Sequence, residues 1–167
     1  MLKLGKGFQV VGEGALQVGG AAAGSVLAGA FAARASYKLP VWGEPYAQLE
    51  FLGATGDGDP TDGAVSTFNQ LFPTGHAHLG YMDYVGWQNV WSFKGTVGFR
   101  PMGAHVWLDV HHFRLWDARG AWYNAGGGVF RAADAARTDN AMGTELDLSV
   151  SVPITRYAAL AGAYGIF

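Results

Sequence analysis

The chain has 167 residues, of which 50% are hydrophobic, 14% are aromatic and 14% are charged, with a formal net charge of −2. Soluble domains carry about 25% charged residues, so this chain is poor in charge, and its aromatic content excludes a disordered polymer. The lack of cysteine excludes a disulfide framework and a thiolate metal site, and the charge balance lacks the basic footprint expected of a nucleic-acid-binding protein.

The first two expected strands lie at residues 7–18 and 26–38. In the first, Leu16 and Val18 alternate with Glu13 and Gln17. Successive side chains of a strand point to opposite faces, so this alternation predicts one apolar and one polar face. The uncharged stretch 14–33 is long enough for a membrane helix. Its five glycines instead favour two strands that meet at a Gly/Ala turn.

Five further strands are expected at residues 46–55, 91–100, 105–111, 144–152 and 157–167. The clearest is 144–152, where Leu146, Leu148, Val150 and Val152 alternate with acidic and serine side chains. In a soluble sandwich such an apolar face meets a core, whereas in an outer-membrane barrel it meets lipid and the polar face lines the lumen. No stretch of comparable length shows a helical period.

The expected connections differ in length according to the rim on which they lie. Links 39–45, 101–103 and 153–156 are short and contain proline, whereas links 57–89 and 117–140 are long. The link at 19–25 is short but belongs to the rim of the long loops. Long loops on one rim and short turns on the other are typical of outer-membrane barrels. Strands of about 9 to 12 residues also suit a tilted membrane span better than a soluble sheet.

Aromatic residues gather near both sets of connections. One group lies at the short turns, and a second group lies near the long loops. Such girdles are expected at the two interfaces of a membrane barrel, although aromatics could also pack the cores of the loops. The residues concerned are Tyr37, Trp42 and Tyr46 in the first group, and Tyr81, Tyr84, Trp87, Trp91, Phe113, Trp116, Trp122 and Tyr123 in the second.

Six ordered blocks carry a resemblance to a known family. The most specific is Phe-Asn-Gln-Leu-Phe-Pro-Thr at 68–74, and the others include Leu-Asp-Val-His at 108–111, Trp-Tyr-Asn-Ala-Gly-Gly at 122–127 and Gly-Thr-Glu-Leu-Asp-Leu at 143–148. From about residue 26 onward, the chain resembles the alginate-export family of bacterial outer-membrane porins. This resemblance implies a large monomeric barrel that moves polysaccharide or small polar solutes through a polar lumen.

Together these observations predict an all-β protein, namely an antiparallel transmembrane β-barrel segment spanning 1–167 as one unit in the bacterial outer membrane. Compared with the family, the chain lacks an N-terminal half and a last strand. Seven strands are odd in number and fewer than the roughly eight of the smallest single-chain barrel. The chain is therefore expected to be part of a larger barrel, or to associate with further copies if it stands alone, because an open edge in lipid is costly.

The polar faces of the expected strands supply the candidate pore-lining residues. Arginine and lysine would attract the carboxylates of an anionic polysaccharide such as alginate, and acidic side chains would space them, as charged rings do in selective pores. The alternative is that opposite charges on neighbouring strands pair as structural contacts. The set is Arg34, Lys38, Glu50, Lys94, Arg100, His105, Asp109, His111, Glu145 and Asp147, with Glu13, Gln17 and Gln48 on the same faces.

Within this set, Lys94 and Arg100 are the strongest candidates for contact with an acidic glycan, since they share one face of one strand. Lys38 and Arg100 lie near turns and are therefore expected at the periplasmic mouth. The expected partners are outer-membrane lipid and the solute, and passive passage through the lumen requires no cofactor.

Other chemistry finds less support in the sequence. Asp57, Asp59 and Asp62 suggest a calcium loop, but the fifth and sixth positions of the EF-hand pattern fail, so an acidic turn is favoured and another kind of calcium site stays open. The histidines at 76, 78, 111 and 112 lack the further ligands that a zinc site needs. A membrane-embedded hydrolase using Asp109 and His111, and a soluble β-sandwich that binds a ligand, remain the alternatives to a channel.

Overall fold

The computed structural model describes residues 2–3, 7–59, 61–73 and 76–167, and within these ranges the chain is almost entirely antiparallel β-sheet. The expected all-β class is therefore confirmed, and each of the seven expected strands is present. The long strands are β2 (Phe8–Ala21), β3 (Gly24–Lys38), β4 (Tyr46–Ala54), β6 (Val90–Phe99), β7 (His105–Leu115), β10 (Ala141–Thr155) and β11 (Ala158–Ile166). The short elements are β1 (Leu2–Lys3), β5 (Ala64–Val65), α1 (His76–Leu79), the 3-10 helix η1 (Pro101–Gly103), β8 (Trp122–Tyr123) and β9 (Val129–Arg131).

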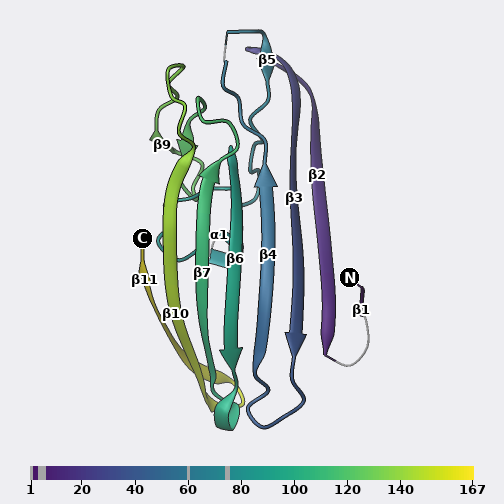
Figure 1. Cartoon of the computed structure of the whole chain (residues 1–167), viewed down its shortest axis with the longest axis vertical. Helices are drawn as coiled ribbons and strands as arrows, with labels where there is room; N and C mark the ends of the chain where they lie inside the picture. Colours follow the sequence, from purple (N-terminus) through teal and green to yellow (C-terminus); the bar gives the residue numbers. More distant parts are fainter. Residues whose placement is uncertain (1, 4–6, 60, 74–75) are drawn as a thin grey trace.

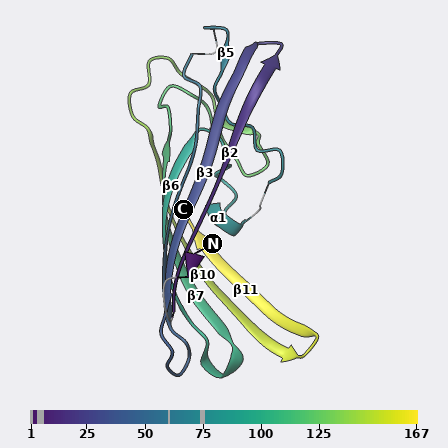
Figure 2. The ribbon, with the colours of Figure 1, turned by 90° about the vertical axis from the view of Figure 1, so that its right-hand side faces the viewer.

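The long strands pair in chain order as an up-and-down meander, β2-β3-β4-β6-β7-β10-β11. The two long loops and the β2–β3 turn gather at one end of the sheet, and the short turns gather at the other (Figure 1). We call these ends the long-loop rim and the short-turn rim. The sheet is curved, and α1 lies on its concave side (Figure 2). Over the described part of the chain the sheet does not close on itself.

The β2–β3 hairpin settles the choice between a helix and two strands for residues 14–33. Its strands pair continuously from Phe8 with Tyr37 to Ala21 with Gly24. No helix in the described ranges has the length and apolar character needed to cross a membrane.

One expected boundary is wrong, because Pro153 lies inside β10 rather than in a turn. The last residue of β10 that pairs with β7 is Ser151, so at Pro153 the strand has only β11 as its neighbour, and the ladder is irregular there. Proline is tolerated at such a position because no partner strand requires its missing N–H group.

The two faces of the sheet have an inverted burial pattern. On the convex side, apolar residues such as Leu49 and Leu148 remain 56% and 50% exposed, whereas on the concave side Glu50 and Asp147 are 2% and 0% exposed. We call these the outward and inward faces. A β-sandwich would bury the apolar face against a second sheet. Within the described residues no such sheet covers it, so these residues do not form a β-sandwich.

The long-loop rim contains the apolar core of the chain. Phe113, Leu115, Val90, Val85 and Trp122 are buried there, where strand ends and loops meet. Two aromatic residues of the group expected near this rim, Trp122 and Phe113, are thus buried in the core, as the alternative of aromatics that pack the loop cores describes. Trp91 and Trp116 do lie on the outward side, where they contact Phe51 and Phe31 at ring centroid distances of 6.2 and 6.4 Å.

The Asn89 side chain joins the two long loops. It donates to the carbonyl oxygens of Asp117 at 3.1 Å and Ala121 at 2.9 Å, and its Oδ1 accepts from the Asp117 N–H at 2.8 Å. Asn89 is fully buried and has a φ of 49°, a left-handed conformation that asparagine adopts more readily than most residues.

Replacing Asn89 by alanine is expected to destabilise the fold by about 2 kcal/mol, because it leaves buried backbone groups of the second loop without partners. Urea unfolding of the chain measures this loss. Asn124→Ala is the matched control, since Asn124 makes one side-chain hydrogen bond to Gly128 in an exposed part of the loop. Equal effects of the two substitutions would contradict the joining role of Asn89.

Candidate functional site

A single row of ionisable side chains crosses the inward face of the sheet. The strand register places Arg34 beside Glu50, Glu50 beside Lys94, Lys94 beside His111 and His111 beside Glu145. Directly opposed residues of neighbouring strands lie close enough for their side chains to interact. The row thus brings five of the ten predicted pore-lining residues together, with basic and acidic groups alternating along most of it.

Glu50 is the centre of this row. Its Oε1 lies 3.3 Å from the Lys94 Nζ and 3.0 Å from the His78 Nδ1, and its Oε2 lies 3.8 Å from the Arg34 Nη1. The Lys94 ammonium also donates to the Ala77 carbonyl at 3.2 Å. A buried charge is stable only when it is paired and hydrogen-bonded, so this carboxylate and the cations around it depend on one another.

Part of the β4–β6 connection lies on the inward face, whereas β5 of the same connection stays at the long-loop rim beside β3. We call residues 76–83, which include α1, the infolded segment. The Tyr81 N–H donates to Asp147 at 3.2 Å, and the Met82 N–H donates to the Oε1 of Glu145 at 2.8 Å. Glu145 and Asp147 therefore act as hydrogen-bond acceptors for this segment, a structural role other than the pairing of opposite charges considered for the predicted set.

Gly80 allows the infolded segment to approach Glu145. It has a φ of +84°, and a Cβ atom at this position would lie 2.4 Å from the Glu145 Oε1. That carboxylate is held by the Met82 N–H, so it could move only by giving up this bond. Only glycine adopts such a left-handed conformation without a steric cost.

Gly80→Ala is expected to displace the infolded segment and to accelerate hydrogen exchange at the Tyr81 and Met82 amides by about tenfold. The reason is that an alanine held in the left-handed conformation of residue 80 costs about 1–2 kcal/mol. Hydrogen exchange of the folded chain, measured by mass spectrometry, detects this change directly. Gly63→Ala is the control, because Gly63 also has a positive φ but has nothing within 4 Å of an added Cβ. Unchanged exchange in the Gly80 variant would show that the approach is not needed.

A polar cavity of about 240 Å³ lies beside the infolded segment, between it and the short-turn rim, and its lining includes Arg34, Lys94, His105 and Asp109. His105 Nε2 lies 2.9 Å from the Tyr46 hydroxyl, and its ring stacks on Trp107 at 4.4 Å. Asp109 accepts a short hydrogen bond from the Thr96 hydroxyl. This cavity offers cations, hydrogen-bonding groups and aromatic rings in one place.

The remaining two predicted residues, Lys38 and Arg100, lie at the short-turn rim as expected, and they share one partner. The Glu44 carboxylate is 3.0 Å from the Lys38 Nζ and 3.6 Å from the Arg100 Nη1. The hydrogen bond and charge of Lys38, with a smaller contribution from Arg100, hold the pKa of Glu44 below its ordinary value.

Because the pKa of Glu44 is lowered in the folded chain, the rim contacts are expected to be complete above the ordinary glutamate pKa and to be lost as the pH falls through the lowered folded pKa. The carboxyl carbon shift of Glu44, followed by NMR as a function of pH, measures this. In a Lys38→Gln variant the titration should move upward toward the ordinary value. An unmoved midpoint would contradict the assigned cause.

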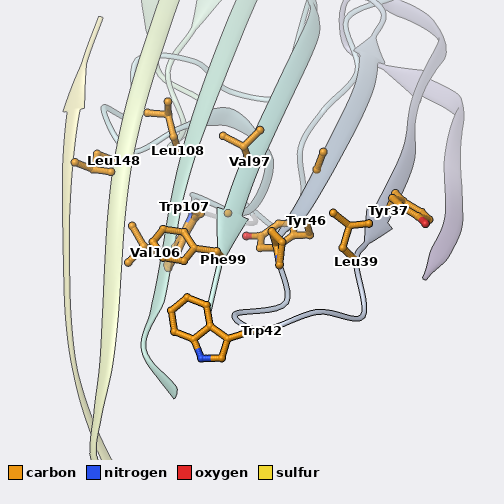
Figure 3. A pocket seen from close by; sticks show the side chains of 13 residues that line it. Tyr37, Leu39, Trp42, Tyr46, Val97, Phe99, Val106, Trp107, Leu108 and Leu148 are labelled. Carbon is orange, nitrogen blue, oxygen red and sulfur yellow. The ribbon is translucent and has the colours of Figure 1, made fainter. Parts of the chain in front are cut away.

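A large apolar groove lies on the outward face, away from this polar chemistry. It encloses about 660 Å³ near the short-turn rim, and Trp42, Phe99 and Val97 are among its lining residues. Figure 3 shows these side chains with Leu108 and Leu148 on neighbouring strands. Trp42 is 77% exposed and Tyr37 is 45% exposed, so the expected aromatic group at this rim includes outward residues, whereas Tyr46 faces inward.

Sequence reasoning did not identify the infolded segment or the role of His78. His78 lies 3.0 Å from Glu50 and 4.0 Å from Glu13, which brings a residue of the long loop into the charged row. The Phe-Asn-Gln-Leu-Phe-Pro-Thr block marked this loop, and the histidines at 76 and 78 were considered as metal ligands, but neither indicated where the loop lies. Thr74 and Gly75 lie outside the described residues.

The residues considered for other chemistry make different contacts in the described part of the chain. His111 lies 3.4 Å from Asp147, and Asp109 contacts Thr96 instead, so the hydrolase pair of Asp109 and His111 is not assembled. Asp57, Asp59 and Asp62 cap turns through the N–H groups of Asp59, Thr61 and Ala64, as an acidic turn would. In the described ranges no group of three or more histidine, aspartate or glutamate side chains is placed to hold a metal ion.

Comparison with known proteins adds one finding. The family model described as "Alginate export" matches residues 4–167, which is essentially the whole chain. No curated protein and no solved structure gives a significant match. The resemblance expected from the sequence blocks is confirmed.

Proposed function

Because this chain belongs to the alginate-export family, which is a transport family, we propose that its sheet forms one wall of an outer-membrane channel. The outward face would contact lipid, and the inward face would line a path for an acidic polysaccharide or for small polar solutes. Passage would be passive and would need no cofactor. The strands that complete the wall would come from a longer parent chain or from further copies.

The inverted burial of the sheet carries this proposal. Its outward face exposes Leu16, Leu148 and Leu160, which are 72%, 50% and 69% exposed, and transfer of such side chains from water to hydrocarbon is favourable by about 25 cal/mol per Å². β7 has 11 residues, which at about 3.3 Å per residue and a tilt of about 40° reach roughly 25 Å along the membrane normal. That height matches the apolar band of outer-membrane barrels.

The inward face supplies the chemistry for an acidic glycan. Arg34 and Lys94 lie beside the cavity of about 240 Å³, where their cations would attract a uronate carboxylate, and Gln48 and Asp109 offer hydrogen bonds to sugar hydroxyls. Both cations already contact Glu50, which limits how tightly they would hold a passing carboxylate. Conduction requires binding that is strong enough for entry and weak enough for release.

The infolded segment would set the width of the path. It lies over the charged row and contacts residues of β4, β6 and β10 through Glu50, Lys94, Glu145 and Asp147. Loops inside barrels that narrow or plug the lumen occur in outer-membrane proteins. The solute would then pass beside this segment, along the side where Arg34 and Lys94 remain in the cavity.

Cysteine accessibility tests the two faces, since the chain contains no cysteine of its own. Single cysteines replace Gln48 on the inward face and Leu49 on the outward face, and the vesicle-bound protein is treated with a charged, membrane-impermeant thiol reagent. The inward cysteine should react, and the outward one should be protected until detergent is added. Equal labelling of neighbouring residues 48 and 49 would contradict the assignment of lipid to one face.

Ion current across a planar bilayer tests the path itself. Reconstituted protein should conduct, and oligouronate added to one side should block the current more strongly than a neutral oligosaccharide of equal length. The Lys94→Gln variant should lose part of this preference. Stably inserted protein that carries no current, or that is blocked equally by both glycans, would argue against a channel for acidic polysaccharide.

A further inference from the structure

The outward face of the sheet contains a pair of basic side chains. Along the outward positions of the seven long strands, over the part of the chain that the structure describes, His112 and Arg114 on β7 are the only acidic or basic residues. Their flanking outward residues include Val110 on β7 and Phe93 on β6. A charge on a lipid-facing surface is costly unless it reaches the interface or a partner, so these two positions call for an explanation.

Arg114 has no acidic partner among the ion pairs of the described residues. Its guanidinium carbon lies 5.7 Å from the centroid of the Trp91 ring, and its buried Nε has no hydrogen-bond acceptor. His112 is exposed and uses its Nδ1 toward the Thr144 hydroxyl at 3.1 Å. Among the described residues, the terminal Nη groups of Arg114 and the Nε2 of His112 have no hydrogen-bond partner, so these nitrogen atoms remain for a ligand that is not part of the protein.

The pair lies where the apolar band ends. Arg114 pairs with Ala141, the first residue of β10, and β7 ends at Leu115 before the long loop. Trp116, next along the chain, is 46% exposed and contacts Phe31. Tryptophan marks the level of the lipid headgroups in membrane proteins, so Arg114 and His112 lie at or just below that level on the long-loop rim.

We propose that Arg114 and His112, with Trp91 beside them, bind the phosphate of an anionic membrane lipid at the long-loop rim. This inference rests on the membrane location given under the proposed function. The two residues share one face of β7 with Cα atoms roughly 7 Å apart, so both side chains can converge on one phosphate. A guanidinium donates two parallel hydrogen bonds to phosphate oxygens, and the acyl chains would lie along the apolar surface formed by Phe93 and Val110.

Lipid selectivity measured by electron paramagnetic resonance tests the site. Protein is reconstituted in phosphatidylcholine vesicles with spin-labelled phosphatidic acid or spin-labelled phosphatidylcholine, and the motionally restricted fraction of each is compared. The native chain should prefer phosphatidic acid, and Arg114→Gln should reduce that preference by about fivefold, as expected for one basic residue at a membrane surface. Arg114→Lys should retain part of it, and His112→Gln should reduce it less.

Arg119→Gln provides the matched control. It removes one positive charge at the same rim, but Arg119 is already paired with Asp117 at 3.1 Å, so the lipid preference should not change. An unaltered preference in Arg114→Gln and in the double variant would overturn the proposal. Release of the labelled lipid by inorganic phosphate alone would also overturn it, because the site would then take the free anion.

Vesicle flotation separates this inference from the proposed function. If the native chain does not float with vesicles, the membrane location itself fails. The membrane location holds if the native chain floats and the outward Leu49→Cys variant is protected from the thiol reagent. If the native chain then shows no preference for phosphatidic acid, only the lipid site fails.

Discussion

Replacing Leu148 by arginine is expected to prevent stable insertion of the chain into a lipid bilayer. Leu148 lies midway along β10, faces outward between Leu108 of β7 and Tyr164 of β11, and is 50% exposed. An arginine at the bilayer midplane of an outer-membrane strand costs about 2–4 kcal/mol. The fraction of protein that folds into vesicles from urea, read by heat-modifiable mobility in gels, measures the loss.

Ile154→Arg is the matched control for Leu148→Arg. Ile154 lies on the same strand and is 63% exposed, but it is close to the short-turn rim. The cost of an arginine falls to about 0–1 kcal/mol near the membrane interface, so this variant should insert almost normally. If both variants insert as the native chain does, the outward face of β10 does not meet lipid. If both fail equally, depth in the membrane is not the cause.

Replacing Glu50 by leucine is expected to cost about 3–5 kcal/mol of folding stability, the range for removal of one partner from a buried ion pair. The substitution leaves the Lys94 ammonium, which is 7% exposed, without its carboxylate, and it removes the contact that His78 makes from the infolded segment. Urea unfolding in vesicles measures the stability, and hydrogen exchange at residues 76–83 should increase in the same variant.

A second substitution makes this test specific for the ion pair. Lys94→Met in the Glu50→Leu background should recover part of the stability, because the unpaired ammonium is removed and an apolar pair of similar volume replaces it. Gln48→Leu is the control on the same face of β4, two residues away, where no charge is left unpaired. A double variant no more stable than Glu50→Leu alone would show that the pair is not the source of the loss.

The sequence contains enough information to locate the strands. Alternation with a period of two marks each long strand within a few residues, because a strand whose faces meet different surroundings must alternate along its whole length. Segment 144–152 shows this most clearly, and it falls inside β10 (Ala141–Thr155). The loop lengths and the family blocks agree with the outward exposure of Leu146 and Leu148, which is the pattern that the proposed membrane location requires.

Only the tertiary structure determines which polar residues meet. The row from Arg34 through Glu50 and Lys94 to Glu145 depends on strand register, and a shift of two residues in one strand would preserve every face while changing every pair. The positions of the aromatic residues also depend on the tertiary structure. Both Trp91 and Trp122 were expected in one aromatic group near the long loops, yet Trp91 lies on the outward face and Trp122 is buried among the loops.

The infolded segment lay beyond sequence reasoning for a related reason. Its sequence shows no hydrophobic periodicity. Its position depends on hydrogen bonds that Asp147 and Glu145 accept from its backbone N–H groups, and these partners are 66 and 63 residues apart along the chain. The sequence by itself thus determined the strands, their two faces and the family, because these follow from local alternation and ordered blocks. The tertiary structure decided which charges pair and what lies over them, because long-range contacts depend on how the whole sheet is assembled.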